Sequence, residues 1–136
     1  MEFSWPVRVY IEDTDAGGIV YYVNYLKFME RARTEFLRHI GFDHAKMIGQ
    51  GSMFVIHSAN TRYLQLAVLD DELQVTVSLS SIKRSSVTFT QRVLRASSQD
   101  ILAETDVRAV CVLKESMKPC AIEADMVAAL QVYVPA

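Results

Sequence analysis

The chain has 136 residues, of which 51% are apolar, and its formal net charge is −2 at pH 7. This length fits one domain, residues 1–136, and the apolar content is enough for a sizeable core, which excludes an intrinsically disordered chain. Because there is no basic excess, nucleic acid is not expected as the main partner. No apolar run approaches the roughly 20 residues that a membrane-spanning helix needs.

The N-terminus and the two cysteines indicate a reducing compartment. Residues 1–10 lack the basic and apolar regions of a secretory signal peptide. Cys111 lies in an alternating apolar run, which predicts a buried thiol, and Cys120 follows a proline in an expected loop. Neither has the CxxC or Cys/His spacing of a metal site. We therefore expect a soluble cytoplasmic protein without a bound metal.

Residues 3–11 alternate between apolar and polar side chains, which predicts a half-buried strand. The face expected to be buried carries Phe3, Trp5, Val7, Val9 and Ile11. Pro6 removes one ladder donor, so this strand is expected at an edge of its sheet or at a bulge.

Two carboxylates and two glycines then interrupt the alternation, in the segment DTDAGG of residues 13–18. The glycine pair permits a positive φ and a close approach of the backbone to a ligand. A carboxylate just ahead of a helix is a candidate for acyl chemistry. The unbonded N–H groups at the helix start can stabilise an oxyanion, and the carboxylate can attack a carbonyl or activate water.

A long amphipathic helix is predicted to begin between Tyr22 and Asn24 and to end at Gly41, after about 17 to 19 residues. Asn24 is the expected N-cap, because its side chain can accept a bond from an early N–H group. The apolar face carries Tyr25, Phe28, Met29, Ala32, Phe36 and Ile40. A short second helix is expected within residues 42–50, with Asp43 as its N-cap.

Four further strands are predicted at residues 53–66, 73–82, 87–94 and 101–113, followed by a short terminal helix at 123–132. This order indicates an α+β domain in which an antiparallel sheet of about five strands wraps around one long central helix. The open sheet edges predict a homo-oligomer.

The segment DTDAGGIVY of residues 13–21, with Asn24, Tyr25 and the ERARTE segment of residues 30–35, resembles the 4-hydroxybenzoyl-CoA thioesterase group of hotdog-fold proteins. Within that group it looks most like the acyl-CoA thioesterases associated with the bacterial Tol–Pal system. The resemblance implies a hotdog fold and hydrolysis of an acyl-CoA thioester to a carboxylic acid and free CoA. It implies no metal or organic cofactor, and a homodimer or homotetramer with its site between subunits.

The resemblance also assigns roles to residues. The second aspartate of the motif is the catalytic one in this family, which is Asp15 here. The backbone N–H at the helix start, at Tyr22 or its neighbours, polarises the thioester carbonyl. Close relatives in the Tol–Pal group carry histidine at the position of Tyr22, whereas a tyrosine there is similar to the hydroxybenzoyl-CoA enzymes. The backbone role survives this difference, and the acyl preference stays open.

The residues themselves allow alternatives. Asp15 can attack the thioester carbon or deprotonate a water, but Asp13 and Asp15 can also merely shape a turn or cap the helix. Gly18 is a candidate substrate contact, and Tyr21, Tyr22 and Tyr25 are candidates for lining an acyl pocket. Core packing is the favoured interpretation for Tyr25.

Two candidates lie outside the motif. His57 falls in the middle of a predicted strand, where it can contact substrate or serve a structural role. Lys83, Arg84 and Ser85 form a polar turn whose cations and hydroxyl can hold the CoA phosphates, with an ordinary hairpin as the alternative.

The rival functions are a non-catalytic acyl-CoA or acyl-carrier binding or scaffold protein of envelope lipid metabolism, and another hotdog activity such as a dehydratase. The intact Asp15 argues against the first, and the second generally needs a different arrangement of histidine and carboxylate. An acyl carrier protein is a second candidate donor, because it shares the phosphopantetheine arm with CoA. Aliphatic acyl-CoA is preferred, because the ERARTE helix resembles the Tol–Pal group.

Overall fold

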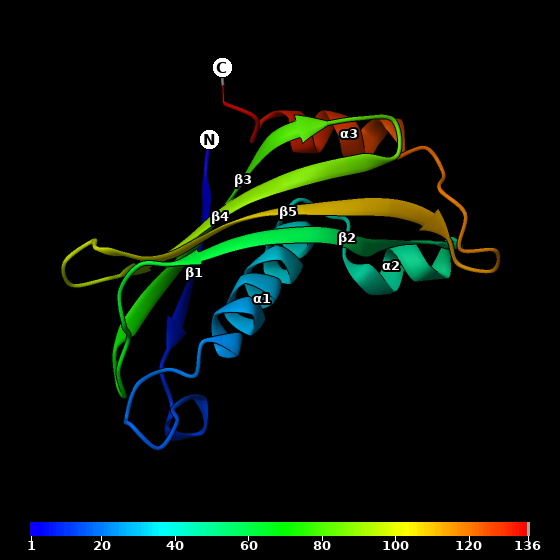
Figure 1. The fold of residues 1–136 in the computed structure, drawn as a ribbon. Coiled ribbons are helices and arrows are strands. Elements are labelled where there is room, and N and C mark those ends of the chain that lie inside the picture. The colour runs from blue at the N-terminus through cyan, green and yellow to red at the C-terminus, as the bar shows by residue number, and fades with distance from the viewer. Residues whose placement is uncertain (136) are drawn as a thin grey trace.

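One long helix lies against the inner face of a curved antiparallel sheet (Figure 1). The computed structural model describes residues 1–135. The five strands are β1 (Phe3–Arg8), β2 (Ser52–Tyr63), β3 (Glu72–Ile82), β4 (Ser86–Arg95) and β5 (Ile101–Leu113), in the spatial order β1-β3-β4-β5-β2. The helices are α1 (Val23–His39), α2 (His44–Gly49) and α3 (Ala124–Gln131), with a 3₁₀ turn at Ile11–Asp13. The predicted α+β class and the sheet wrapped around a central helix are confirmed.

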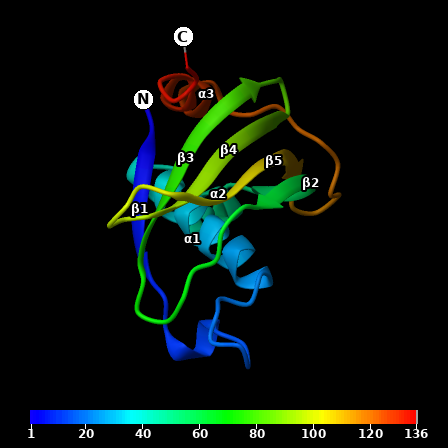
Figure 2. The same ribbon diagram turned by 60° about the vertical axis from the view of Figure 1, so that its left-hand side comes forward.

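The two edges of the sheet are β1 and β2. β1 pairs with β3 alone, and Pro6 lies opposite Gln74 in that ladder, so the expected edge position of the proline is confirmed. β2 pairs with β5 alone, and a bulge interrupts its register between Ile56 and Ser58. Viewed from a second direction, β1 and β2 lie on opposite sides of α1 (Figure 2). Among residues 1–135, no helix is long and apolar enough to cross a membrane.

The first strand is shorter than its sequence pattern predicts. Ile11 is 76% exposed and begins the 3₁₀ turn, so its assignment to the buried face is wrong. The turn forms because the Asp13 carboxylate accepts a bond from the Tyr10 amide at 2.8 Å, while the Asp13 amide donates to the Tyr10 carbonyl at 3.0 Å. These local bonds replace the ladder that would have continued the strand.

The predicted start, end and length of α1 are confirmed, but the predicted N-cap is wrong. Asn24 is not the N-cap; it lies inside the first turn, and its side-chain amide donates to the carbonyl oxygen of Asp13 at 2.8 Å. Gly41 does follow the helix, with a φ of 90°, and Phe42 donates back to the Leu37 carbonyl at 2.8 Å. This reversal needs a left-handed residue, which explains the glycine. Asp43 caps α2 as expected, accepting from the Lys46 amide at 2.8 Å.

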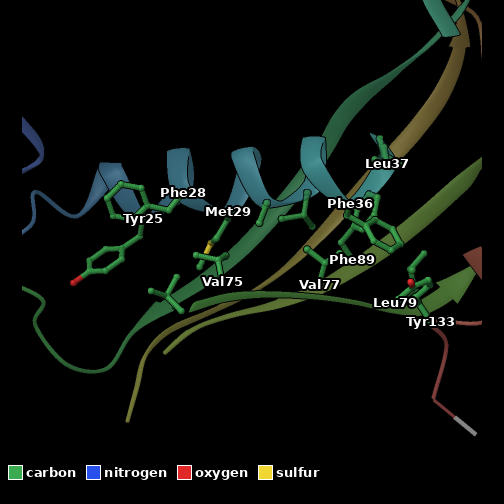
Figure 3. Close-up of a cluster of buried hydrophobic side chains, with 14 of the residues drawn as sticks. Tyr25, Phe28, Met29, Phe36, Leu37, Val75, Val77, Leu79, Phe89 and Tyr133 are labelled. Carbon is green, nitrogen blue, oxygen red and sulfur yellow. The ribbon is translucent and has the colours of Figure 1, made fainter. Parts of the chain in front are cut away.

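The core lies between α1 and the sheet (Figure 3). Phe28, Met29, Ala32 and Phe36 are fully buried, as the helical periodicity predicts. The Phe36 ring meets Tyr133 edge-on at 4.7 Å between centroids, which anchors the segment after α3 to α1. The amide of Leu79 in β3 donates to the Tyr133 carbonyl at 3.0 Å, so this segment also closes one end of the sheet.

One amide side chain is fully buried in this apolar interface. Gln91 of β4 is 0% exposed and donates to the Met29 carbonyl of α1 at 2.9 Å. Its oxygen accepts a bond from the Arg33 guanidinium at 2.8 Å. Because a buried amide is costly unless both its ends are bonded, this bridge fixes the position of α1 along the sheet.

Truncating the core face of α1 should cost far more than truncating its partly exposed flank. We expect Phe36→Ala to lower the free energy of unfolding by about 3–5 kcal/mol, since it opens a cavity beneath Tyr133. Leu26→Ala, on the same helix but 38% exposed, should cost about 1 kcal/mol or less. Urea unfolding followed by circular dichroism measures both, and equal losses would contradict this account of the core.

Candidate active site

Asp15 sits in a small hairpin ahead of α1. Its amide donates to the Ile19 carbonyl at 2.9 Å, and Gly18 donates back to the Asp15 carbonyl at 3.0 Å. Gly18 has a φ of 78°, which an L side chain rarely adopts, so the glycine is required for the turn itself. The backbone of Asp15 is therefore fixed by local bonds.

The Asp15 carboxylate is exposed and only partly bonded. The Gly17 amide donates to Oδ1 at 2.8 Å. Within residues 1–135, no hydrogen bond or ion pair reaches Oδ2. A Cβ added to Gly17 would lie 3.3 Å from Oδ1, so the glycine leaves this oxygen room. One oxygen is thus held while the other is available for reaction.

The start of α1 has two bonded and two unbonded backbone N–H groups. The Asn24 amide donates to the Tyr21 carbonyl at 2.8 Å, and the Tyr25 amide to the Tyr22 carbonyl at 3.2 Å. The amides of Tyr22 and Val23 have no acceptor within the part of the chain that the structure describes. Unbonded amides at the positive end of a helix are suited to stabilising a developing oxyanion.

Asp13 joins the carboxylate loop to the helix. Its carbonyl oxygen accepts from the Tyr21 amide at 3.0 Å and from the Asn24 side chain at 2.8 Å. Its buried carboxylate accepts from Tyr10. The turn-shaping role considered for both aspartates therefore fits Asp13. It also fits Oδ1 of Asp15, because its bond from the Gly17 amide, two residues on, shapes the hairpin, while Oδ2 is left out of this turn.

A row of tyrosine rings borders the helix start. Tyr21 and Tyr22 lie 5.1 Å apart between centroids, and Tyr22 meets Tyr63 edge-on at 5.6 Å. Burial raises the pKa of Tyr63, and the nearby Tyr22 phenol adds to the rise. Tyr63 was missed in the sequence because it is the last residue of β2 and belongs to no motif. Only the fold brings it against Tyr22.

Tyr25 continues this row into the core. Its ring lies 5.7 Å from that of Tyr63, but its side chain is buried, and its hydroxyl accepts a bond from the Ala67 amide at 3.0 Å. The structure thus supports core packing for Tyr25, rather than pocket lining. Tyr21 and Tyr22 are exposed, as acyl-lining residues would be.

An open groove of about 330 Å³ starts at Val23 and runs between α1 and β2. Its apolar wall consists of Val23, Leu26, Met29, Ile56, Ala59 and Val107. Charged side chains of α1, including Arg33, lie along the same groove. A chain entering it would pass the unbonded amides, so the groove is suited to an apolar acyl group.

Other predicted site residues lie away from Asp15 in the same chain. The turn of Lys83, Arg84 and Ser85 lies at the far end of β3, and the 11-residue strand spans roughly 35 Å (Figure 1). The carbonyls of Arg84 and Ser85 accept from Ile122 and Cys111, which ties the turn to the C-terminal segment.

His57 lies at the β2 bulge and is exposed. Its Nδ1 is 3.5 Å from an Arg108 nitrogen. Neither His57 nor the turn of Lys83, Arg84 and Ser85 shares a hydrogen bond or ion pair with Asp15 in residues 1–135.

The two cysteines lie next to each other near the turn of Lys83, Arg84 and Ser85. Their sulfurs lie 3.4 Å apart, and burial raises the pKa of the Cys111 thiol to about 12. The expected burial of Cys111 is confirmed, but its proximity to Cys120 was not foreseen. Among the described residues, no three His, Cys, Asp or Glu side chains gather as ligands for a metal ion.

Comparisons with known proteins agree on one family. Residues 9–130 match the thioesterase-like superfamily. Acyl-CoA thioester hydrolase YbgC of Escherichia coli O6:H1 is 44% identical over 126 residues, covering 93% of each chain. Acyl-CoA thioesterase YbgC of Haemophilus influenzae is 41% identical over 128 residues, again covering 93% of each chain. The 1,4-dihydroxy-2-naphthoyl-CoA thioesterase of Synechocystis superposes with a TM-score of 0.90 over 96% of both chains; its identity is 20%. The predicted hotdog fold is confirmed.

The buried Tyr25 hydroxyl should make the free energy of unfolding depend on pH in the alkaline range. Burial raises its pKa, so the folded state holds the phenol proton more tightly than the unfolded state, whose pKa is about 10. Its stabilising effect is complete below that pH and is lost as pH rises through the folded value. Tyr25→Phe should cost roughly 1 kcal/mol at pH 7, because the Ala67 amide loses its acceptor, and should flatten the alkaline decline.

The free energy of unfolding between pH 7 and 11 measures this effect. Tyr21→Phe, at an exposed ring, is the matched control and should follow the wild-type curve. A Tyr25→Phe curve parallel to wild type above pH 10 would show that this hydroxyl does not govern the decline.

Proposed function

The chain belongs to the thioesterase-like superfamily and is a thioester hydrolase, and on this premise we propose that Asp15 and the helix-start amides of Tyr22 and Val23 hydrolyse acyl-CoA to a carboxylic acid and free CoA. The observation that carries the proposal is their juxtaposition. The Asp15 carboxylate, which has one unbonded oxygen, lies two residues after Asp13. The Asp13 carbonyl accepts bonds from Tyr21 and Asn24, the residues that flank the unbonded amides of Tyr22 and Val23 in the chain.

The amides of Tyr22 and Val23 would hold the thioester carbonyl oxygen as it gains negative charge. Asp15 then acts by one of two routes that share this geometry. In the first, its carboxylate attacks the carbonyl carbon, the C–S bond breaks, CoA leaves as a thiolate, and water hydrolyses the mixed anhydride. In the second, Asp15 takes a proton from a water whose oxygen attacks the same carbon. A thiolate needs little protonation to leave, so neither route needs a separate strong acid.

The groove between α1 and β2 supports an aliphatic acyl group as substrate. Leu26, Ile56 and Val107 supply apolar surface along it, beginning next to the proposed oxyanion site. The exposed rings of Tyr21 and Tyr22 at its mouth are also suited to contacting an acyl group. An acyl group on a carrier protein is the second donor, because it presents the same thioester and arm as CoA.

The edge strand β2 supports a homodimer. It is 12 residues long, its outer edge carries no ladder within residues 1–135, and Ile56 on it is 52% exposed. A second copy pairing along this edge would cover these groups. Lys83, Arg84 and Ser85 would then be candidates for holding the CoA phosphates of a site in another copy. We place this activity in the cytoplasm, where acyl-CoA is available.

The catalytic assignment is tested by thiol release from acetyl-, hexanoyl-, palmitoyl- and benzoyl-CoA. We expect wild type to turn over at least one ester and Asp15→Asn to lose about a thousandfold or more in kcat. Glu12→Gln, which neutralises an exposed carboxylate of the same segment, should stay within about twofold of wild type. Activity in a folded Asp15→Asn would reject the mechanism, and an inactive wild type would favour the non-catalytic binding role.

The dimer is tested by light scattering coupled to gel filtration. Wild type should elute at twice the mass of one chain or a multiple of it. Ile56→Lys should shift it toward the monomer, because a charge would be buried between two edge strands. Ile48→Lys, at a 40% exposed site on α2, is the matched control and should leave the mass unchanged. A monomeric wild type would overturn the interface.

A further inference from the structure

We propose that Asn24 is a positioning residue that fixes the distance between Asp15 and the helix-start amides; this inference rests on the function proposed above. Asn24 is the second residue of α1 and is buried. Asparagine is a poor choice for a helix interior, and at helix starts it usually accepts bonds from the helix itself. Here its Nδ2 instead donates outward, to the Asp13 carbonyl at 2.8 Å.

The Asp13 carbonyl is the point where three segments meet. Asp13 is the last residue of the 3₁₀ turn and lies two residues before Asp15 in the chain. The Asp13 carbonyl accepts a hydrogen bond from the Tyr21 amide, at the end of the hairpin, at 3.0 Å. It accepts another from the side chain of Asn24 in the first turn of the helix. The Asp13 carboxylate accepts the Tyr10 amide at 2.8 Å, which fixes the orientation of this residue from its other side.

The bonds inside the hairpin do not by themselves locate Asp15 relative to α1. They join Asp15 to Ile19 and Gly18, and Val20 to Ala67 of the loop after β2. Asn24 adds a side-chain bond that crosses from the first helical turn to the residues just before Asp15. Without it, the first helical turn is linked to Asp13, among the described residues, only through Tyr21, whose amide donates to the Asp13 carbonyl at 3.0 Å and whose carbonyl accepts from the Asn24 amide at 2.8 Å.

This geometry predicts an effect on the chemical step rather than on binding. The reacting carboxylate and the oxyanion donors act on the same carbonyl, and a misplacement of about 1 Å can cost on the order of a hundredfold in rate. Asn24 does not line the groove and takes no part in the contacts between the tyrosine rings, the two features that would hold the substrate in its ground state. Loss of the bond should therefore lower kcat and leave KM nearly unchanged.

Two substitutions remove the donor in different ways. Asn24→Leu keeps the branching at Cγ in a larger, apolar side chain and improves helix propensity. Asn24→Asp keeps the shape, cannot donate when ionised, and places a negative charge at the favourable end of the helix dipole. We expect both to lower kcat by about 10- to 100-fold with KM within about threefold of wild type.

Thr14→Val is the matched control. Thr14 adjoins Asp15, and its hydroxyl donates to the Ile11 carbonyl at 2.7 Å, inside the loop and not across to the helix. Its kcat should stay within about threefold of wild type. A similar fall in Thr14→Val and the Asn24 variants would indicate general loosening of the loop and would overturn the proposal.

Amide hydrogen exchange supplies a readout that does not depend on activity. The Tyr21 amide, which shares the Asp13 carbonyl with Asn24, should exchange faster in both Asn24 variants than in wild type or Thr14→Val. If wild type hydrolyses thioesters through Asp15 but the Asn24 variants keep its kcat, this inference alone fails. If wild type hydrolyses nothing, the proposed function fails, and unchanged exchange at Tyr21 would then also reject the positioning role.

Discussion

Burial of the apolar face of α1 against the curved sheet is the interaction on which the rest of the structure depends. Phe28, Met29, Ala32 and Phe36 cover the inner face of the sheet along the helix. Burial alone is not directional and would tolerate some sliding of the helix. The amide of Gln91, bonded to both Met29 and Arg33, removes that freedom at the middle of α1. The start of the helix is thereby held in a defined place.

A helix start placed in this way is also incompletely capped. Tyr22 occupies the N-cap position without a capping side chain. Backbone carbonyls of Tyr21 and Tyr22 accept from the Asn24 and Tyr25 amides instead, and the amides of Tyr22 and Val23 have no acceptor in the described part of the chain. An uncapped helix start costs some stability, since a good cap is worth about 1 kcal/mol. The hairpin that bears Asp15 and the exposed ring of Tyr22 border this site, which is suited to a carbonyl oxygen instead. If the proposed function is correct, the residues that lack a capping side chain are also the ones that stabilise the oxyanion.

A single chain leaves the groove and the edge of β2 exposed, and it does not bring the Lys83 turn close to the Asp15 loop. The groove between α1 and β2 remains open on the side of the β2 edge, and the basic turn at Lys83 lies at the other end of β3 from the Asp15 loop. A β-sheet edge and an apolar groove on the same border are both better covered than left in water. A homodimer formed along the β2 edge would cover both the edge and the groove.

The sequence alone determined the elements and the candidate carboxylate. Helical spacing from Tyr25 to Phe36, the glycine after α1 and the Asp43 cap are local patterns, and each is confirmed because backbone geometry depends mainly on near neighbours. The five predicted strands are present, although the alternation extends past the end of the first strand and β2 does not show alternating burial. Tertiary structure decided what distant groups do to each other. It made Asn24 a donor to Asp13, set Tyr63 against Tyr22, brought the Ala67 amide to the Tyr25 hydroxyl and brought Cys111 to Cys120. The direction in which a polar side chain points depends on the partner group that lies nearby after the chain has packed. No local pattern of the sequence contains that information.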